Sequence, residues 1–234
     1  MIQLSIVIPC YNEGQNLSLL LKQAHHLLQQ RHDLEFILVN NGSTDQSVEW
    51  LEPVAHERLK VISISTNHGY GYGILVGLSQ AQGDVLGWTH ADLVHGLEDA
   101  LQLFDYFQQA KKSNIILKGQ RQCRGLFETF YAWIVQGLCR LLIHQKLHDI
   151  RCQPKLFSRE FYEDHLKRKA PQDFTLDLYL LYQANKCHYQ IIEQPVNYQP
   201  RQHGLAKGVG HWRTGIRQLK KTFLYLLRLK NHTS

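Results

Sequence analysis

A short stretch near position 90 brings together two side chains that can bind a divalent cation. Residues Val85 to Gly96 read V-L-G-W-T-H-A-D-L-V-H-G, so an apolar run ends in His90 and Asp92. Positions i and i+2 of an extended chain point to the same side, so both side chains can face one ion. A His-x-Asp pair also occurs by chance where a strand leaves a sheet. Whether this one is a metal site or only a polar strand end depends on the elements around it.

Two more polar clusters follow apolar runs of the kind that form buried strands. Tyr11 to Glu13 come after the run Leu4–Pro9, and Asn40 to Asp45 come after a second run that begins at Glu35. Such β-branched runs without alternation are typical of parallel strands buried on both faces. Ligands of parallel α/β sheets bind beyond the carboxyl ends of the strands, so we expect the three clusters to share one site.

The segments between these runs predict the connections of a right-handed, mostly parallel α/β sheet flanked by helices. Asn16 can cap a helix that runs to about Gln30, and Lys60 to Ser65 predict a third strand. The next helix, to about Gln82, opens with glycine at every second position: Gly69, Gly71 and Gly73. These glycines either let backbone amides approach a phosphate or form a tight turn, and both interpretations stay open.

The second half of the chain continues the alternation. The predicted elements are a helix from Leu97, a strand at 114–118, a helix at 126–144, a late strand entered from 148–157, a helix beginning at 173–177 and a strand at 189–196. The helix at 126–144 is apolar nearly all round, which favours packing against the domain or contact with lipid.

Composition describes a folded protein of a reducing compartment. The 234 residues are 44% hydrophobic and 20% charged, and the five cysteines are scattered without a C-x-x-C pair. This pattern argues against a disulfide framework or a zinc site. The N-terminus shows no signal peptide and no run of 18 apolar residues occurs, so a cytoplasmic location is expected.

The net charge of +6 is concentrated at the C-terminus. No acidic residue follows Glu193, whereas eight basic residues do, which favours an anionic partner such as phosphate, a lipid headgroup or nucleic acid. The periodicity predicts a basic amphipathic helix with one apolar face: Trp212, Ile216, Leu219, Phe223 and Leu226. Such a helix lies on an anionic membrane or packs on the domain, and both remain open. No recognised nucleic-acid motif accompanies it, so nucleic acid is not expected as the partner.

Six motifs in order resemble those of family 2 glycosyltransferases with the GT-A fold. The motifs are Ser5–Glu13, Val39–Asp45, Gly83–Asp92, Lys118–Arg121, His148–Phe157 and Arg201–Lys207. The last three look like the dolichol-phosphate mannosyltransferase branch. The resemblance implies a GT-A domain over residues 1–208, followed by the basic helix at 209–234.

The resemblance also implies roles for individual residues. Those expected to bind the nucleotide-sugar donor, UDP- or GDP-linked, are Pro9, Tyr11, Glu13, Asn40, Asn41, Asp45, Gly71, Ala91 and Lys207. Asp92 matches the residue that holds Mg²⁺ or Mn²⁺ on the donor diphosphate, and His90 replaces the first Asp of the usual D-x-D. Imidazole suits Mn²⁺ better than Mg²⁺. Arg121 and Arg201, together with Lys207, would hold donor or acceptor phosphates.

The implied reaction is an inverting sugar transfer in which the ion and basic side chains stabilise the departing diphosphate. A hydroxyl acceptor would need a carboxylate base, for which Asp173 or Asp177 are candidates. A lipid phosphate is already ionised near neutral pH and needs none; the basic tail favours this acceptor. The expected location is the cytoplasm, with a peripheral position at the membrane and a membrane-protein partner as further expectations. The alternatives are transfer to a saccharide hydroxyl, or a nucleotide-sugar-binding protein without activity, suggested by His90 and the Asn40–Asn41 pair.

Overall fold

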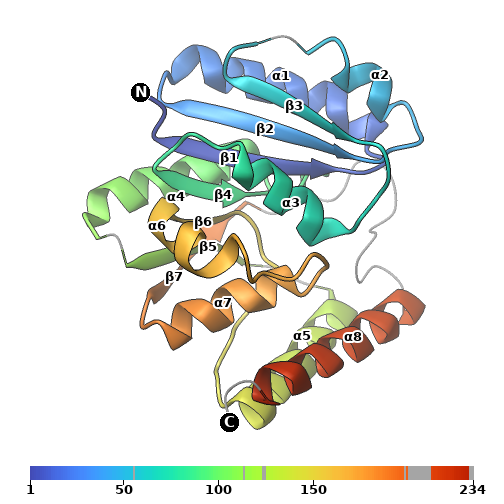
Figure 1. Cartoon of the computed structure of the whole chain (residues 1–234), viewed down its shortest axis with the longest axis vertical. Coiled ribbons are helices and arrows are strands. Elements are labelled where there is room, and N and C mark those ends of the chain that lie inside the picture. Colours follow the sequence, from blue (N-terminus) through green and yellow to red (C-terminus); the bar gives the residue numbers. More distant parts are fainter. Residues whose placement is uncertain (55, 113, 123–124, 198, 200–211, 232–234) are drawn as a thin grey trace.

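The computed structural model describes residues 1–54, 56–112, 114–122, 125–197, 199 and 212–231, and these form one seven-stranded sheet between two helical layers (Figure 1). The strand order is β3-β2-β1-β4-β6-β5-β7. The strands are β1 (Leu4–Cys10), β2 (Leu34–Asn41), β3 (Leu59–Ile64), β4 (Val85–Trp88), β5 (Ile115–Arg121), β6 (Lys155–Ser158) and β7 (Gln190–Val196).

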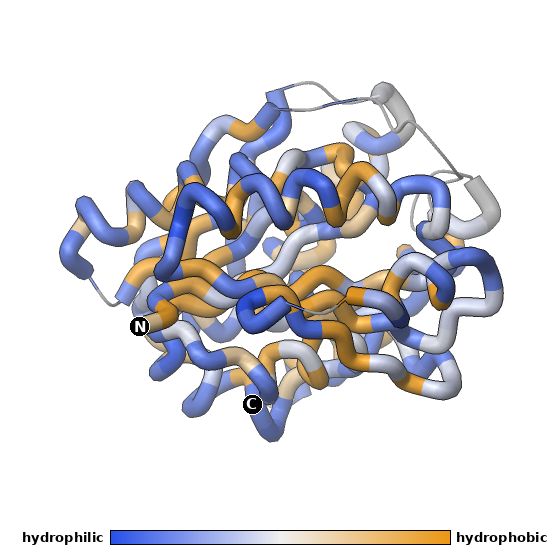
Figure 2. The backbone as a smooth tube through the Cα atoms, turned by 90° about the horizontal axis from the view of Figure 1, so that it is seen from above, coloured by the Kyte–Doolittle hydropathy of each residue, from blue (hydrophilic) through white to orange (hydrophobic). Residues whose placement is uncertain are grey.

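Helices cover both faces of the sheet. They are α1 (Gly14–Gln30), α2 (Ser47–Leu51), α3 (Tyr70–Ser79), α4 (Leu97–Ala110), α5 (Leu126–Ile143), α6 (Arg159–Phe161), the π-helix η1 (Tyr162–Leu166), α7 (Leu176–Lys186) and α8 (Trp212–Asn231). Helices α1, α2 and α4 bury one apolar layer against the sheet, and α3, α5, α7 and α8 bury the other. The central strands form the apolar interior between more polar helices (Figure 2).

The sheet gathers several strand ends at one edge. Among the described strands, four pairings are parallel and two are antiparallel, both of the latter made by β6. Since β6 is antiparallel to both β4 and β5, those two strands are parallel to each other and end at the same edge as β1 and β2. The residues at these carboxyl ends are Cys10, Asn41, Trp88 and Arg121. The prediction of a mostly parallel sheet is therefore correct, and β6 instead begins at this edge, with Lys155 beside Trp88.

The start of α1 differs from its prediction. The helix begins at Gly14, and Asn16 lies within it, donating from Nδ2 to Glu13 Oε2 at 2.7 Å rather than capping the backbone. The first backbone N–H of the helix, that of Gly14, is instead accepted by Asp45 Oδ2 at 3.1 Å. Asp45 lies in the turn after β2. A local capping rule cannot anticipate an acceptor that lies 31 positions away.

Close packing accounts for one of the spaced glycines. Helix α3 begins at Tyr70, so Gly71 lies in its first turn. A Cβ atom on Gly71 would lie 2.6 Å from the carbonyl oxygen of Pro171 and 2.8 Å from that of Asp173, so only glycine lets α3 approach this loop. The predicted role of Gly71 in donor binding stays a prediction.

Helix α8 lies alongside α5, away from the strands (Figure 1). The single apolar face predicted for α8 is split: Leu226 is buried and Leu219 half-buried, whereas Ile216 and Phe223 are exposed. The side that packs on the domain instead runs through Gln218, Thr222, Tyr225 and Leu229. The side of α8 that is buried depends on the surface of α5 against which it packs, and the periodicity of the sequence does not describe that surface.

Candidate active site

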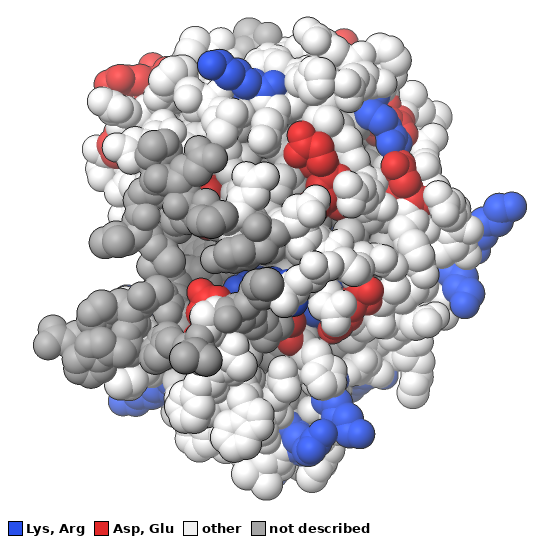
Figure 3. Space-filling model, turned by 180° about the vertical axis from the view of Figure 1, so that it is seen from behind, with Lys and Arg blue, Asp and Glu red and all other residues white. Residues whose placement is uncertain are grey.

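A cavity of about 520 Å³ opens at the edge where these strands end. One wall comes from the loops after β1, β2 and β4, and the opposite wall comes from α5, α7 and α8. From behind, charged side chains of both signs lie in a hollow of the surface (Figure 3).

Most of the predicted site residues meet in this cavity. Those that line it are Pro9, Tyr11, Glu13, Asn41, His90, Ala91, Asp92, Arg121 and Asp177. Four described residues of the predicted set do not line it: Asn40, Asp45, Gly71 and the candidate base Asp173. Arg201 and Lys207 lie outside the described residues.

Asn40 and Asp45 shape the loops that carry the lining residues. Asn40 Oδ1 accepts the backbone N–H of Ser43 at 3.0 Å, which fixes the turn after β2. Asp45 accepts from the backbone N–H groups of Gly14 and Ser47 and so ties that turn to the loop after β1. Burial opposes the charge of Asp45, but these hydrogen bonds outweigh it and lower the pKa of the carboxyl.

Asn41 lines the cavity, and a hydrogen bond holds its amide group. Its Nδ2 donates to the carbonyl of Gly69 at 2.8 Å, which orients the amide. Its Oδ1 is buried and has no hydrogen-bond partner among the described residues. A buried acceptor without a donor is costly, so this oxygen suits the N–H group of a bound ligand.

His90 and Asp92 lie as the sequence predicts, with side chains toward each other. His90 Nδ1 is 3.9 Å from Asp92 Oδ2, and His90 Nε2 is 3.1 Å from the hydroxyl of Tyr70. When Nε2 donates to Tyr70, Nδ1 presents its lone pair on the side of Asp92. Desolvation lowers the pKa of His90 in spite of the nearby carboxylates, which favours the neutral, metal-binding form of the imidazole.

This pair fits a divalent ion that is shared with a ligand. Two donor atoms about 2 Å from one ion lie roughly 3 to 4 Å apart, which agrees with the His90–Asp92 spacing. No group of three or more His, Cys, Asp or Glu side chains is placed for a metal among the described residues. Within the described part of the chain, two ligands rather than a full set are thus available, as expected where substrate phosphates complete the coordination.

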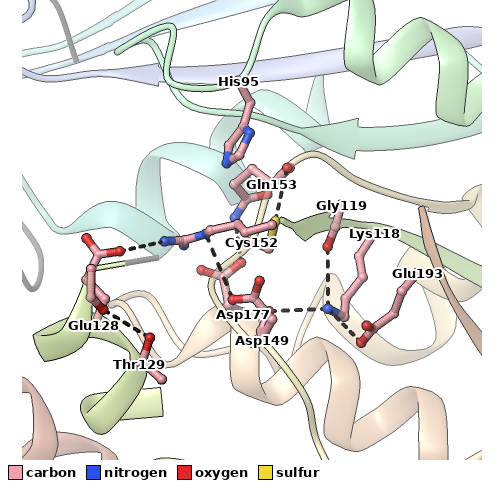
Figure 4. A network of polar contacts seen from close by, with 12 residues as sticks. His95, Lys118, Gly119, Glu128, Thr129, Asp149, Cys152, Gln153, Asp177 and Glu193 are labelled. Atoms are coloured by element: carbon pink, nitrogen blue, oxygen red, sulfur yellow. Dashed lines mark hydrogen bonds and ion pairs between the residues drawn. The ribbon is translucent and has the colours of Figure 1, made fainter. Parts of the chain in front are cut away.

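Arg121 stands across the cavity, held by carboxylates of two other segments. Its Nη1 is 3.4 Å from Glu128 Oε2 on α5, and its Nε is 3.9 Å from Asp149 Oδ1; Figure 4 shows both carboxylates. Burial works against the charge of Arg121, but Asp149 and Glu128 outweigh it and raise the pKa of the guanidinium. The neighbouring Lys118 pairs with Glu193 at 2.9 Å (Figure 4).

Asp177 is the centre of a buried network. Its Oδ1 accepts from Lys155 Nζ at 2.7 Å, from Gln153 Nε2 at 2.9 Å and from Trp88 Nε1 at 3.2 Å. Lys155 is fully buried, and its second acceptor is the carbonyl of Cys152 at 2.9 Å. Three donors on one oxygen indicate that Asp177 positions the cavity floor; its predicted catalytic role stays a prediction.

Sequence reasoning missed an aromatic and cationic group of the cavity wall. The missed residues are Tyr70, Tyr131, Arg151 and Phe174. They lie at helix starts, inside a helix and in an irregular loop. The prediction relied on the ends of predicted strands and therefore did not include them. The charge of Arg151 within the motif 148–157 was the one available signal.

Comparison with known proteins agrees with this geometry. A model of glycosyl transferase family 2 matches residues 5–166, more than half of the chain. The chain belongs to glycosyl transferase family 2. The predicted family is thereby confirmed. The match ends at the last residue of η1, so it covers His90 and Asp92 after β4 and Arg121 at the end of β5.

Two relatives of this family 2 member are transferases whose names contain a polyprenyl phosphate. A dolichyl-phosphate beta-glucosyltransferase of Mus musculus is 28% identical over 222 residues, covering 84% of this chain and 67% of the mouse protein. An undecaprenyl-phosphate 4-deoxy-4-formamido-L-arabinose transferase of Pseudomonas fluorescens is 28% identical, covering 87% of this chain and 59% of that protein. The chain thus spans about three fifths to two thirds of the length of these relatives.

The fold agrees with solved structures. Glucosyl-3-phosphoglycerate synthase of Mycobacterium tuberculosis, in complex with Mn²⁺, UDP-glucose and phosphoglyceric acid, gives a TM-score of 0.75 at 17% identity, covering 97% of this chain and 80% of that one. A mannosyltransferase of Pyrobaculum calidifontis with GDP-Man and Mn²⁺ gives 0.65 at 18% identity, covering 97% and 64%. The predicted GT-A fold of family 2 is confirmed.

Proposed function

We propose that this family 2 member is an inverting glycosyltransferase that moves a sugar from a nucleotide diphosphate to a polyprenyl-phosphate-type lipid. One observation carries the proposal: a single cavity joins the His90–Asp92 pair to a wall of α5 on which Tyr131, Ala132 and Val135 form an apolar strip. The His90–Asp92 end of the cavity suits a charged donor, and the wall on α5 suits an apolar acceptor. The names of the mouse and bacterial relatives support this acceptor class.

The donor lies on the side of the β1, β2 and β4 loops. Asn41 Oδ1 accepts a ring N–H of the base, uracil or guanine, while Pro9 and Tyr11 line the base pocket. His90 and Asp92 hold a divalent ion, Mn²⁺ or Mg²⁺, which neutralises charge on the departing diphosphate. The solved neighbours with Mn²⁺ support this assignment. Arg121 adds a cation on the opposite wall.

The acceptor oxygen attacks the anomeric carbon from the face opposite the diphosphate. A phosphate monoester is largely ionised near neutral pH, its second pKa being about 6, so its oxygen attacks without a base. This agrees with Asp177, whose Oδ1 is already bonded to three donors. The reaction then needs only positioning and charge stabilisation from the protein.

Turnover with a matched acceptor panel tests the proposal. UDP-, GDP- and CDP-sugars are offered with Mn²⁺, Mg²⁺ or chelator, and with undecaprenyl phosphate, a short prenyl phosphate or the corresponding prenyl alcohol. We expect one nucleotide to support transfer to both phosphates, with at least a hundredfold lower rate on the alcohol and no transfer with chelator. Transfer to a saccharide hydroxyl instead, or nucleotide binding without turnover, would contradict the proposal.

We also propose that the α5–α8 pair rests on the cytoplasmic face of an anionic membrane. Both helices expose apolar side chains: Phe130, Trp133 and Leu141 on α5, and Ile216, Phe223 and Leu224 on α8. The exposed charged residues of α8 are all basic: Arg217, Lys220, Lys221, Arg228 and Lys230. None of the described helices has the length and apolarity to cross a bilayer. A surface of apolar and basic side chains suits an anionic interface.

Flotation with vesicles tests this surface. We expect the protein to bind vesicles that contain anionic lipid, and Lys220→Glu/Lys221→Glu to weaken binding at least about tenfold, since each basic residue near such a surface contributes about 1 kcal/mol. The control Arg168→Glu/Lys169→Glu makes the same charge change at exposed positions before α7 and should bind like the parent. Equal binding of both variants, or binding that needs a membrane protein in the vesicle, would contradict a direct lipid contact.

A further inference from the structure

Arg151 is a basic side chain of the cavity wall. The other basic side chains that the structure describes at this edge are paired: Arg121 with Glu128 and Asp149, Lys155 with Asp177, and Lys118 with Glu193. Arg151 lines the same cavity, yet it forms no ion pair with any carboxylate of the described residues. An unpaired cation in a cavity wall indicates a site for an anion.

Two aromatic rings hold the Arg151 guanidinium in place. Its Cζ lies 5.6 Å from the ring centre of Tyr131 on α5 and 5.3 Å from that of Phe174, the residue before Thr175 at the start of α7. Cation–π contacts of this kind orient the planar group without using its N–H donors. The donors therefore stay available for a bidentate contact with phosphate oxygens.

The position of Arg151 places it beside the donor site but outside it. Phe174 stacks on Tyr70 with ring centres 4.9 Å apart and planes 8° apart, and the Tyr70 hydroxyl lies 3.1 Å from His90 Nε2. One aromatic pair thus separates Arg151 from the candidate metal ligands. On its other side, Tyr131 continues into the apolar part of the wall, with Val135 one helical turn further along α5.

We propose that Arg151 binds the phosphate of the acceptor, a phosphate monoester whose apolar remainder extends along α5 toward α8. This inference rests on the proposed function and adds the residue that selects the acceptor. Arg121 and His90–Asp92 then serve the diphosphate of the donor, so the two phosphate groups have separate cations. A soluble phosphate monoester shares the head-group chemistry, but the apolar wall beyond Tyr131 favours a prenyl chain.

The experiment compares Arg151→Gln and Arg151→Lys with the parent, using the full chain, Mn²⁺ and a short prenyl phosphate that needs no vesicle. Loss of a charge-assisted bidentate contact should raise the KM for the prenyl phosphate about tenfold or more, with the KM for the donor within twofold. Arg151→Lys should fall between, because it keeps the charge but loses the planar fork. The control Arg168→Gln removes an exposed arginine that does not line the cavity and should match the parent.

Two further measurements distinguish a failure of this inference from a failure of the proposed function. Equilibrium binding of the prenyl phosphate and of UDP or GDP is measured for each variant, so that a protein without turnover still reports on Arg151. Weaker prenyl-phosphate binding with unchanged nucleotide binding supports the inference even if sugar transfer fails. Equal affinity of Arg151→Gln and the parent, or loss of nucleotide binding as well, overturns it. 3-Phosphoglycerate serves as the soluble monoester: preference for it over the prenyl phosphate would overturn the apolar path.

Discussion

Asp92→Asn lowers turnover by about a thousandfold or more while the protein stays folded. Asp92 supplies the only carboxylate of the two-ligand pair with His90, whose Nδ1 lies 3.9 Å from Asp92 Oδ2. A metal ion on a departing phosphate contributes several kcal/mol to the transition state, and each 1.4 kcal/mol corresponds to a factor of ten in rate. Initial rates at saturating donor, measured across titrations of Mn²⁺ and Mg²⁺, give the effect. Calorimetry should show a parallel loss of metal-dependent nucleotide binding.

Glu98→Gln is the matched control for that change. It also converts one carboxylate to an amide, but Glu98 is exposed on α4 and does not line the cavity, so its turnover should equal that of the parent. If Asp92→Asn kept more than a tenth of the parent rate at saturating Mn²⁺, the His90–Asp92 pair would not be the metal site. Nucleotide binding that is indifferent to chelator in the parent would lead to the same conclusion.

Lys155→Met lowers the free energy of unfolding by about 3–5 kcal/mol. The change leaves the Asp177 carboxylate buried, with Trp88 and Gln153 as its donors but without the ammonium group 2.7 Å away. The double variant Lys155→Met/Asp177→Leu removes both charges and should recover most of the loss, because apolar residues of similar volume often replace a buried ion pair without penalty. Urea unfolding of the parent, both single variants and the double variant gives the coupling energy.

The exposed pair Lys167–Glu163 is the control for this cycle. Its nitrogen and oxygen are 2.6 Å apart, but both side chains are 40% exposed or more, so Lys167→Met should cost less than about 1 kcal/mol. A loss below 1 kcal/mol in Lys155→Met would show that the buried pair does not hold the cavity floor. The folded double variant also tests the rival acceptor, since transfer to a prenyl phosphate without Asp177 would exclude this carboxylate as an obligatory base.

The sequence by itself determined where the strands lie and which of their ends are polar. β1, β2 and β4 are short apolar runs buried on both faces, and such runs are local features of composition. Parallel strands share an edge, so Tyr11, Asn41 and Asp92 had to come together once the runs were recognised. The His90–Asp92 pair followed from the same logic, because its members are two positions apart.

Only the tertiary structure decided which side chains face one another across the cavity. The antiparallel insertion of β6 brings Lys155 to Asp177 and carries Arg151 between Tyr131 and Phe174. These partners are 20 or more positions apart, and no local periodicity encodes such an approach. The outward Ile216 and Phe223 of α8 have the same cause: the sequence specifies that the helix is amphipathic, but the surface of α5 determines which side is buried.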